Sequence, residues 1–304
     1  DGKVAIFDEN GNQISPDWFN DIEIEGLIMG QSPYYIAKKD GKYAIFDKDG
    51  NQITKWFDDI YPFGLVMGES NLYVAGDNGK YAIFDINGNR ITDWYDEVSF
   101  EGLVRGESRY YIAKKDGEYA IFDKDGNMIT KEWYDDIHPE GLVRGQSNLY
   151  IVERDGQYTI FDINGNQIIP KWFNEIVSYG LVRGESNLYI AREDDKYVIY
   201  DEDGNQISQL FDDIEIDGLV RGQSPYYIAR EEGGFAIFHK DGKRISQWYD
   251  GIWPDGLVKG QSNYYVAYND GKFAIFDVYG NQVSPGWFDR IYPFGFLRGE
   301  SNYY

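Results

Sequence analysis

The side chains that most often carry out catalysis are scarce in this sequence. It has two histidines, His138 and His239, and no cysteine. Each histidine replaces a different residue in one copy of a repeated pattern, and neither has a serine or cysteine partner or the spacing of metal ligands. Carboxylates are abundant, so a pair placed for glycosidic hydrolysis stays open as an alternative. The sequence nevertheless predicts a protein that is not an enzyme and that needs no cofactor.

Acidic turns such as 47–51 and 201–205 resemble calcium-binding loops in composition. An EF-hand loop requires glycine at its sixth position and glutamate at its twelfth, whereas here glycine is fourth and Asp58 is twelfth. Asp-Gly and Asn-Gly pairs are typical of tight hairpins, because these residues tolerate a positive φ angle. We therefore expect hairpin turns and no metal site.

One repeated position carries a cation and is a candidate ligand-binding position. Its residues are Arg105, Arg144, Arg183, Arg221, Lys259 and Arg298, with Met29 and Met67 in the first two copies. We expect these cations on a Gly-Leu-Val strand that is the innermost strand of its sheet. They would then gather near a channel at the centre of the molecule. Such charges need compensation, either by a nearby acid such as Glu107 or Glu185 or by a bound anion.

A second candidate position lies beside these cations. It is the asparagine of a Glu/Gln-Ser-Asn motif, found as Asn71, Asn148, Asn187, Asn263 and Asn302. Amide, hydroxyl and carboxylate groups together suit a hydroxylated ligand. Serine and asparagine also bond to their own backbone in tight turns, so a purely structural role stays open.

Tryptophan recurs at a third position. The residues are Trp18, Trp56, Trp94, Trp133, Trp172, Trp248 and Trp287, with Leu210 in the remaining copy. An aromatic ring in each copy could stack against sugar faces. The replacement by leucine favours packing within the core instead.

These candidates belong to a pattern that recurs every 38 or 39 residues. Eight copies begin near residues 1, 40, 78, 116, 155, 194, 232 and 270. In the second copy we expect four short antiparallel strands at 42–46, 52–60, 64–68 and 71–75. The first contains Tyr-Ala-Ile-Phe without polar alternation, which predicts that both of its faces are buried.

Four strands in each repeat predict an all-β, closed, eight-bladed β-propeller with four-stranded blades, forming one domain over residues 1–304. The first residues match the third and fourth strands of a blade, and the last residues match the first and second. We therefore expect both termini to complete one blade and to leave no unpaired strand edge. An open β-solenoid is the rival architecture.

Composition excludes several classes of partner. The net charge of −23 repels the phosphates of nucleic acids and of anionic membranes. No apolar segment approaches the roughly 18 residues that a membrane-spanning helix requires. Aromatic residues make up 17% of the chain, which supplies a large core.

The repeated residues resemble those of a known family. Gly-Lys-Tyr-Ala-Ile-Phe-Asp, then Trp-Phe-Asp-Asp-Ile and Gly-Leu-Val, within 41–66, are similar to the WG (or KWG) repeats of bacterial proteins. The pair Tyr43-Ala44 stands where that family usually has Trp-Gly. The resemblance implies a propeller-like repeat fold in surface or secreted proteins, without a common activity or catalytic residues.

These observations lead to three hypotheses about function. The first is a non-catalytic protein that binds a carbohydrate or another polymer through several weak sites, outside the cell or at the surface of a bacterium. The second is a rigid scaffold for protein partners, which includes a recently amplified or engineered array. The third is a glycan-active enzyme. The sequence leaves the ligand and the oligomeric state undetermined.

Overall fold

The computed structural model describes residues 2–104, 107–169, 171–177, 181 and 185–304. The chain forms two compact units. The first contains residues 1–137, 142–145 and 163–165, and the second contains 138–141, 146–162 and 166–304. The expectation of a single domain over 1–304 stays a prediction.

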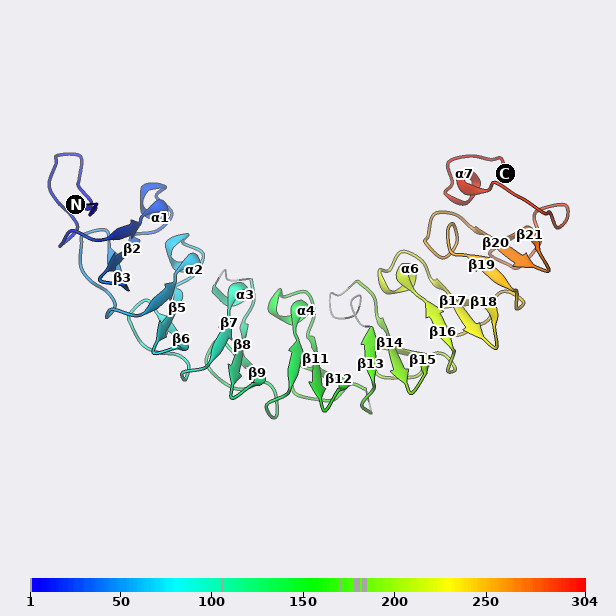
Figure 1. The fold of residues 1–304 in the computed structure, drawn as a ribbon, viewed down its shortest axis with the longest axis horizontal. Helices are drawn as coiled ribbons and strands as arrows, with labels where there is room; N and C mark the ends of the chain where they lie inside the picture. Colours follow the sequence, from blue (N-terminus) through cyan, green and yellow to red (C-terminus); the bar gives the residue numbers. More distant parts are fainter. Residues whose placement is uncertain (1, 105–106, 170, 178–180, 182–184) are drawn as a thin grey trace. The chain divides into compact units, whose positions relative to one another are not determined.

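Within the described residues, the chain forms seven antiparallel sheets of three strands each (Figure 1). The first strands are short: β1 (Asp21–Glu23), β4 (Asp59–Tyr61), β7 (Glu97–Ser99), β10 (Asp136–His138), β13 (Glu175–Val177), β16 (Asp213–Glu215) and β19 (Gly251–Trp253). The central strands are β2 (Tyr34–Lys39), β5 (Leu72–Asp77), β8 (Tyr110–Lys115), β11 (Leu149–Arg154), β14 (Leu188–Glu193), β17 (Tyr226–Glu231) and β20 (Tyr264–Asn269). The third strands are β3 (Lys42–Asp47), β6 (Lys80–Asp85), β9 (Glu118–Asp123), β12 (Gln157–Asp162), β15 (Lys196–Asp201), β18 (Gly234–His239) and β21 (Lys272–Asp277). The all-β repeat architecture predicted from the sequence is confirmed.

The central and third strands of each sheet form a tight hairpin. Between β2 and β3, Asp40 and Gly41 have φ angles of 51° and 82°, which is the left-handed backbone of a two-residue hairpin turn. This turn fixes the register that places Tyr35 opposite Phe46. Their rings stack with centroids 5.4 Å apart, and both side chains are buried. The prediction that this third strand is buried on both faces is confirmed, because Ala44 and Ile45 are also buried.

The segment that follows each third strand is not one continuous strand, as the sequence had suggested. Gln52 and Phe57 pair with Phe46 and Tyr43 through isolated bridges only. The chain then crosses to the next sheet, where Asp59–Tyr61 forms β4 beside β5. A segment expected as one strand at 52–60 therefore serves two sheets, and four-stranded blades are not confirmed.

The Gly-Leu-Val segments were expected as strands, and this expectation is wrong. Six of them form helices of four residues: α1 (Glu25–Ile28), α2 (Phe63–Val66), α3 (Glu101–Val104), α4 (Glu140–Val143), α6 (Asp217–Val220) and α7 (Phe294–Leu297). The segment at 256–258 lies in a turn, and the segment at 180–182 lies partly outside the described residues. A Cβ atom on Gly26 would lie 1.7 Å from the carbonyl oxygen of Val66 in the next repeat. Glycine is required because the helical turns of successive repeats pack backbone against backbone.

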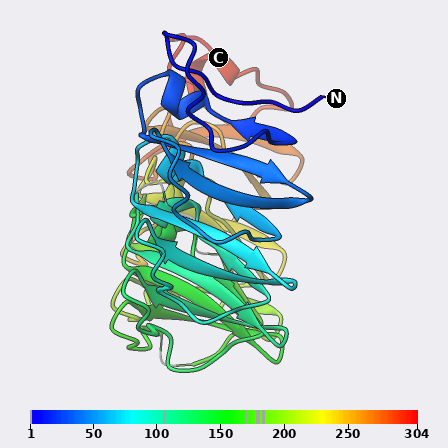
Figure 2. The same cartoon turned by 90° about the vertical axis from the view of Figure 1, so that its left-hand side faces the viewer.

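The core lies between neighbouring sheets. In the first unit, Val74 and Ile83 of one sheet pack with Tyr111, Ala113 and Phe122 of the next, and all five are buried. Figure 2 shows the blue-to-cyan sheets of this unit stacked face to face. In the described part of the chain, no helix is long and apolar enough to cross a bilayer.

Candidate functional site

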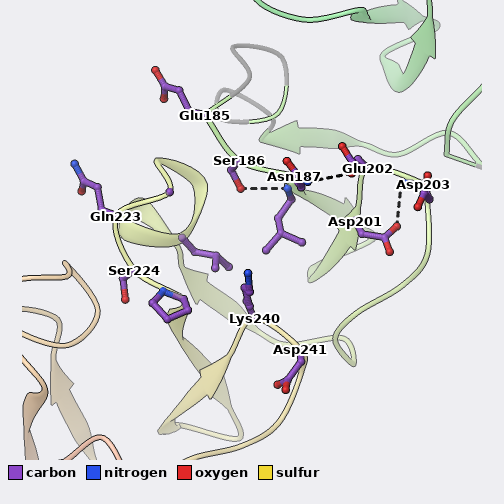
Figure 3. Close-up of a pocket in the computed structure, with 14 residues that line it drawn as sticks. Glu185, Ser186, Asn187, Asp201, Glu202, Asp203, Gln223, Ser224, Lys240 and Asp241 are labelled. Atoms are coloured by element: carbon purple, nitrogen blue, oxygen red, sulfur yellow. Dashed lines mark hydrogen bonds between the residues drawn. The ribbon is translucent and has the colours of Figure 1, made fainter.

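A cavity of about 620 Å³ lies between two neighbouring sheets of the second unit (Figure 3). Its walls are turns at the same end of both sheets. One sheet supplies the turn before β14 and the turn after β15, and the other supplies the turns before β17 and after β18. The lining residues are Glu185–Leu188, Asp201–Asp203, Leu219, Gly222–Pro225, Lys240 and Asp241.

Hydrogen bonds fix the two turns of the first sheet to one another. The amide Nδ2 of Asn187 donates to Glu202 Oε1 at 3.0 Å. Asp201 accepts from the backbone NH groups of Asp203 (3.1 Å) and Asn205 (2.7 Å), so its carboxylate is occupied in closing its own turn. The groups that remain for a ligand are the carbonyl oxygen of Asn187 and part of the Glu202 carboxylate.

The two turns of the second sheet are also joined. The backbone NH of Lys240 donates to the carbonyl oxygen of Pro225 at 2.7 Å. Figure 3 shows the Lys240 side chain extending into the cavity toward Ser186 and Asn187. Leu219 supplies a buried apolar surface beside these polar groups.

The asparagines predicted as binding residues are all exposed. Four of them directly precede a central strand, Asn302 does not, and Asn187 lines the cavity. The five exposed asparagines are Asn71, Asn148, Asn187, Asn263 and Asn302.

The serine of each Glu/Gln-Ser motif has a structural role. Ser186 Oγ accepts from the backbone NH of Leu188 at 3.1 Å, and the same bond occurs at Ser70 and Leu72. Ser224 Oγ donates to the carbonyl oxygen of Leu257 in the next repeat at 2.7 Å. The turn interpretation of this serine is confirmed.

The predicted cations do not lie on an inner strand. Arg221 and Arg298 directly follow α6 and α7 as C-cap residues, and Arg144 and Lys259 are likewise exposed. Lys259 pairs with Asp255 at 2.9 Å, four residues earlier, and not with the residue two positions later. Arg105 and Arg183 lie outside the described residues. This placement follows from the helices that replaced the expected strands.

Several tryptophans pack between repeats, whereas Trp18 is 47% exposed and contacts Phe7 of its own repeat. Trp56 contacts Phe19 of the preceding repeat and Phe46 of its own, with ring centroids 6.2 and 6.0 Å apart. Trp133 and Trp287 make corresponding contacts with Tyr95 and Tyr249 of the preceding repeats, both at 6.0 Å. The core interpretation of this position is therefore confirmed for Trp56, Trp133 and Trp287.

The acidic turns close on themselves. Asp47 accepts from the backbone NH groups of Asp49 and Asn51 and from the Asn51 side chain at 2.8 to 2.9 Å. At the corresponding Asp85, the hydrogen bond from the Asn89 side chain holds the pKa of the carboxyl below its usual range. The hairpin-turn prediction is confirmed.

Sequence reasoning missed two residues of the cavity, Glu202 and Lys240. Both occupy the variable position of the acidic turn, which is lysine, isoleucine, glutamate or valine in other copies. One feature of the sequence could have identified them. The Glu/Gln-Ser-Asn turn precedes the first strand of each hairpin, and the acidic turn follows the second strand. That pairing brings both motifs to the same end of the sheet.

Comparisons with known proteins give no assignment. No family model matches the chain, and no curated protein matches it in sequence. The WG-repeat resemblance therefore stays a prediction.

Solved structures that are similar share little sequence with this chain. One is a eukaryotic initiation factor, at 11% identity and a TM-score of 0.31, covering 93% of this chain and 92% of that one. Another is Hsv2 of Kluyveromyces lactis, at 10% identity and a TM-score of 0.28, covering 82% of this chain and 87% of that one. TM-scores at this level carry no argument about fold closure or function.

Proposed function

We propose that this chain is a non-catalytic, multivalent protein that binds a carbohydrate polymer in the clefts between neighbouring repeats. The observation that carries the proposal is the cavity between the β13-β14-β15 and β16-β17-β18 sheets. Its volume of about 620 Å³ lies within the range of roughly 300–1,000 Å³ that is typical of ligand sites.

The chemistry of the lining suits a hydroxylated ligand. Hydroxyl groups both donate and accept, and the cavity offers acceptors at Asn187 and Glu202 and a donor at Lys240. Leu188 and Leu219 add apolar surface against which a sugar ring packs. The tryptophans have no part in this proposal, because none of the residues that line the cavity is a tryptophan.

Repetition of the same two turns supports several sites on one chain. The exposed asparagine recurs as Asn71, Asn148, Asn187 and Asn263, each at the start of a central strand. Sites that are individually weak bind a polymer tightly when several engage at once, by factors of about 10² to 10⁴. An extracellular or cell-surface location, where such polymers occur, is part of this proposal.

A triple variant tests the role of these asparagines. Asn148→Ala, Asn187→Ala and Asn263→Ala, combined in one chain, should weaken binding to an immobilised glycan that a glycan array has identified, by about tenfold or more. The control is Gln247→Ala, at an exposed side chain outside the cavity. Unchanged binding by the triple variant, or no glycan bound by the wild type, would show that the proposal is wrong.

We also infer that the repeats close into an eight-bladed ring in which both termini share one blade. The sequence of residues 301–304 matches the start of a central strand, and the hairpin at 4–19 matches a third strand with its bridged partner. Phe7 and Tyr304 are 49% and 43% exposed, whereas their counterparts Phe46 and Tyr35 are buried against each other. Closure would bury this pair in the same way.

A further inference from the structure

Lys240 differs from the corresponding lysines of other repeats in its ionic contacts. In the turns with the sequence Asp-Lys-Asp-Gly-Asn, Lys48 lies 3.7 Å from the carboxylate of Asp49 and Lys124 lies 2.5 Å from that of Asp125. Lys240 is followed by Asp241 in the same way, yet it has no ion-pair partner among the described residues. Its ammonium group is therefore available inside the cavity.

The cause is a substitution one residue earlier. His239 occupies a position that is aspartate in all the other copies of the repeat. Its Nδ1 atom lies 2.9 Å from Asp241 Oδ1, and the same oxygen accepts from the backbone NH of Lys243 at 3.0 Å. The backbone NH of Lys243 and the His239 side chain hold the pKa of Asp241 below its usual range. Asp241 is thus held by His239 and not by Lys240.

Most of the acidic groups around the cavity accept hydrogen bonds or contacts from other residues, and each keeps its negative charge. Asp201 closes its own turn, Glu202 accepts from Asn187, and Asp241 is bound to His239. In Figure 3, the remaining acids, Glu185 and Asp203, lie at the edge of the cavity, on two different sides of Lys240. Lys240 is the one cation among these lining residues, so an anionic group bound in the cavity would have to pair with it and lie away from the five carboxylates.

We propose that this cavity binds an acidic sugar unit, with one anionic group paired to Lys240 and hydroxyl groups bonded to Asn187 and Glu202. The inference rests on the proposed function and specifies its ligand at one site. A single negative charge is sufficient, because one ammonium group is available. A carboxylate and a sulfate ester share this chemistry.

Titration with three matched trisaccharides tests the assignment. The probes are a trigalacturonate, a neutral galactotriose and a galactotriose that carries one sulfate ester. We expect the trigalacturonate to bind more tightly than the neutral sugar, by an amount that depends on Lys240. The sulfated probe separates recognition of any anion from recognition of a carboxylate, and tight binding of either anion supports the role of Lys240.

Two variants locate the effect. Lys240→Met should weaken binding of the acidic trisaccharide about fivefold and leave the neutral one unchanged, as expected for one exposed ion pair. His239→Asp should weaken it in the same direction, because Asp241 is released to pair with Lys240 as Asp125 does with Lys124. Lys48→Met is the control, since that lysine already has a partner.

The outcomes separate the two proposals. If the acidic and neutral sugars bind equally and Lys240→Met changes nothing, the Lys240 assignment is wrong while the carbohydrate function stands. If neither sugar binds at concentrations at which an array-identified glycan does, the Lys240 assignment alone is again wrong. If no glycan binds at all, both are wrong.

Discussion

Buried tyrosines are the residues whose ionisation most directly couples this fold to pH. Burial raises the pKa of Tyr35 to about 12, and it also raises the pKa values of Tyr73, Tyr111 and Tyr189. The folded-state values lie above the ordinary value of about 10. The pH-dependent part of the stability is therefore fully present below pH of about 10, where these hydroxyls are neutral in both states, and it is lost as the pH rises through the folded-state values.

We predict alkaline unfolding that coincides with tyrosine ionisation. The part of the tyrosinate absorbance that comes from the buried tyrosines should rise above the ordinary tyrosine pKa, in the same step in which circular dichroism reports loss of the sheets. Titration of all tyrosines near the ordinary value, with the sheet signal intact, would contradict the burial described here.

Removing one of these hydroxyl groups should not destabilise the protein. Tyr111 Oη is buried and has no hydrogen-bond partner within the described residues. Tyr111→Phe should leave the free energy of unfolding unchanged or raise it by about 1 kcal/mol, because an unpaired buried polar group is lost. The measurement is denaturant unfolding.

Tyr119 is the matched control for that substitution. Its hydroxyl accepts from Lys114 Nζ at 2.7 Å, so Tyr119→Phe should lower stability. If Tyr111→Phe is the more destabilising of the two substitutions, the Tyr111 hydroxyl must make a hydrogen bond that is not among the contacts described above.

At the scale of elements, the glycines of two short helices, Gly26 and Gly218, determine how closely the next repeat approaches. A Cβ atom on Gly218 would lie 1.9 Å from the carbonyl oxygen of Val258. Gly218→Ala should therefore lower the free energy of unfolding by about 3 kcal/mol, as overpacking against backbone does. Thermal or denaturant unfolding measures the change.

Gly286 provides the comparison, because a Cβ atom there meets nothing within 4 Å. Gly286→Ala should have little effect on stability. Equal effects of the two substitutions would mean that the helical turns do not pack as described.

The sequence was informative for elements whose signal is local. The Asp-Gly and Asn-Gly pairs predicted the hairpins, and the apolar Tyr-Ala-Ile-Phe segment predicted a strand buried on both faces. The Gly-Leu-Val helices were missed because four residues are too few to show a helical period, and leucine and valine also suit strands. Their glycine is explained by a contact with the neighbouring repeat, which local patterns do not contain.

The candidate site shows the same difference between residues that a local motif predicts and residues whose role depends on contacts in space. Asn187 was predicted from its motif, whereas the availability of the Lys240 ammonium group depends on which side chain Asp241 contacts. Asp241 contacts His239, which replaces the aspartate of the other copies, and this contact is known only from the distances in the structure.

For the whole molecule, ring closure can be tested by cross-linking. The register of Tyr35 opposite Phe46 places Tyr304 opposite Phe7 if the termini share one sheet. With Phe7→Cys and Tyr304→Cys in this cysteine-free chain, mild oxidation should give an intramolecular disulfide, since paired strands bring Cα atoms within about 7 Å. Thiols that stay free, or that link only different chains, would contradict closure.

The central claim is that ligand sites recur between repeats. Isothermal titration of the chain with a short oligosaccharide from the glycan that it binds measures this directly, because a short ligand occupies one cleft at a time. The account predicts more than one saccharide bound per chain at saturation. A stoichiometry of one, with the triple asparagine variant binding as the wild type does, would contradict it.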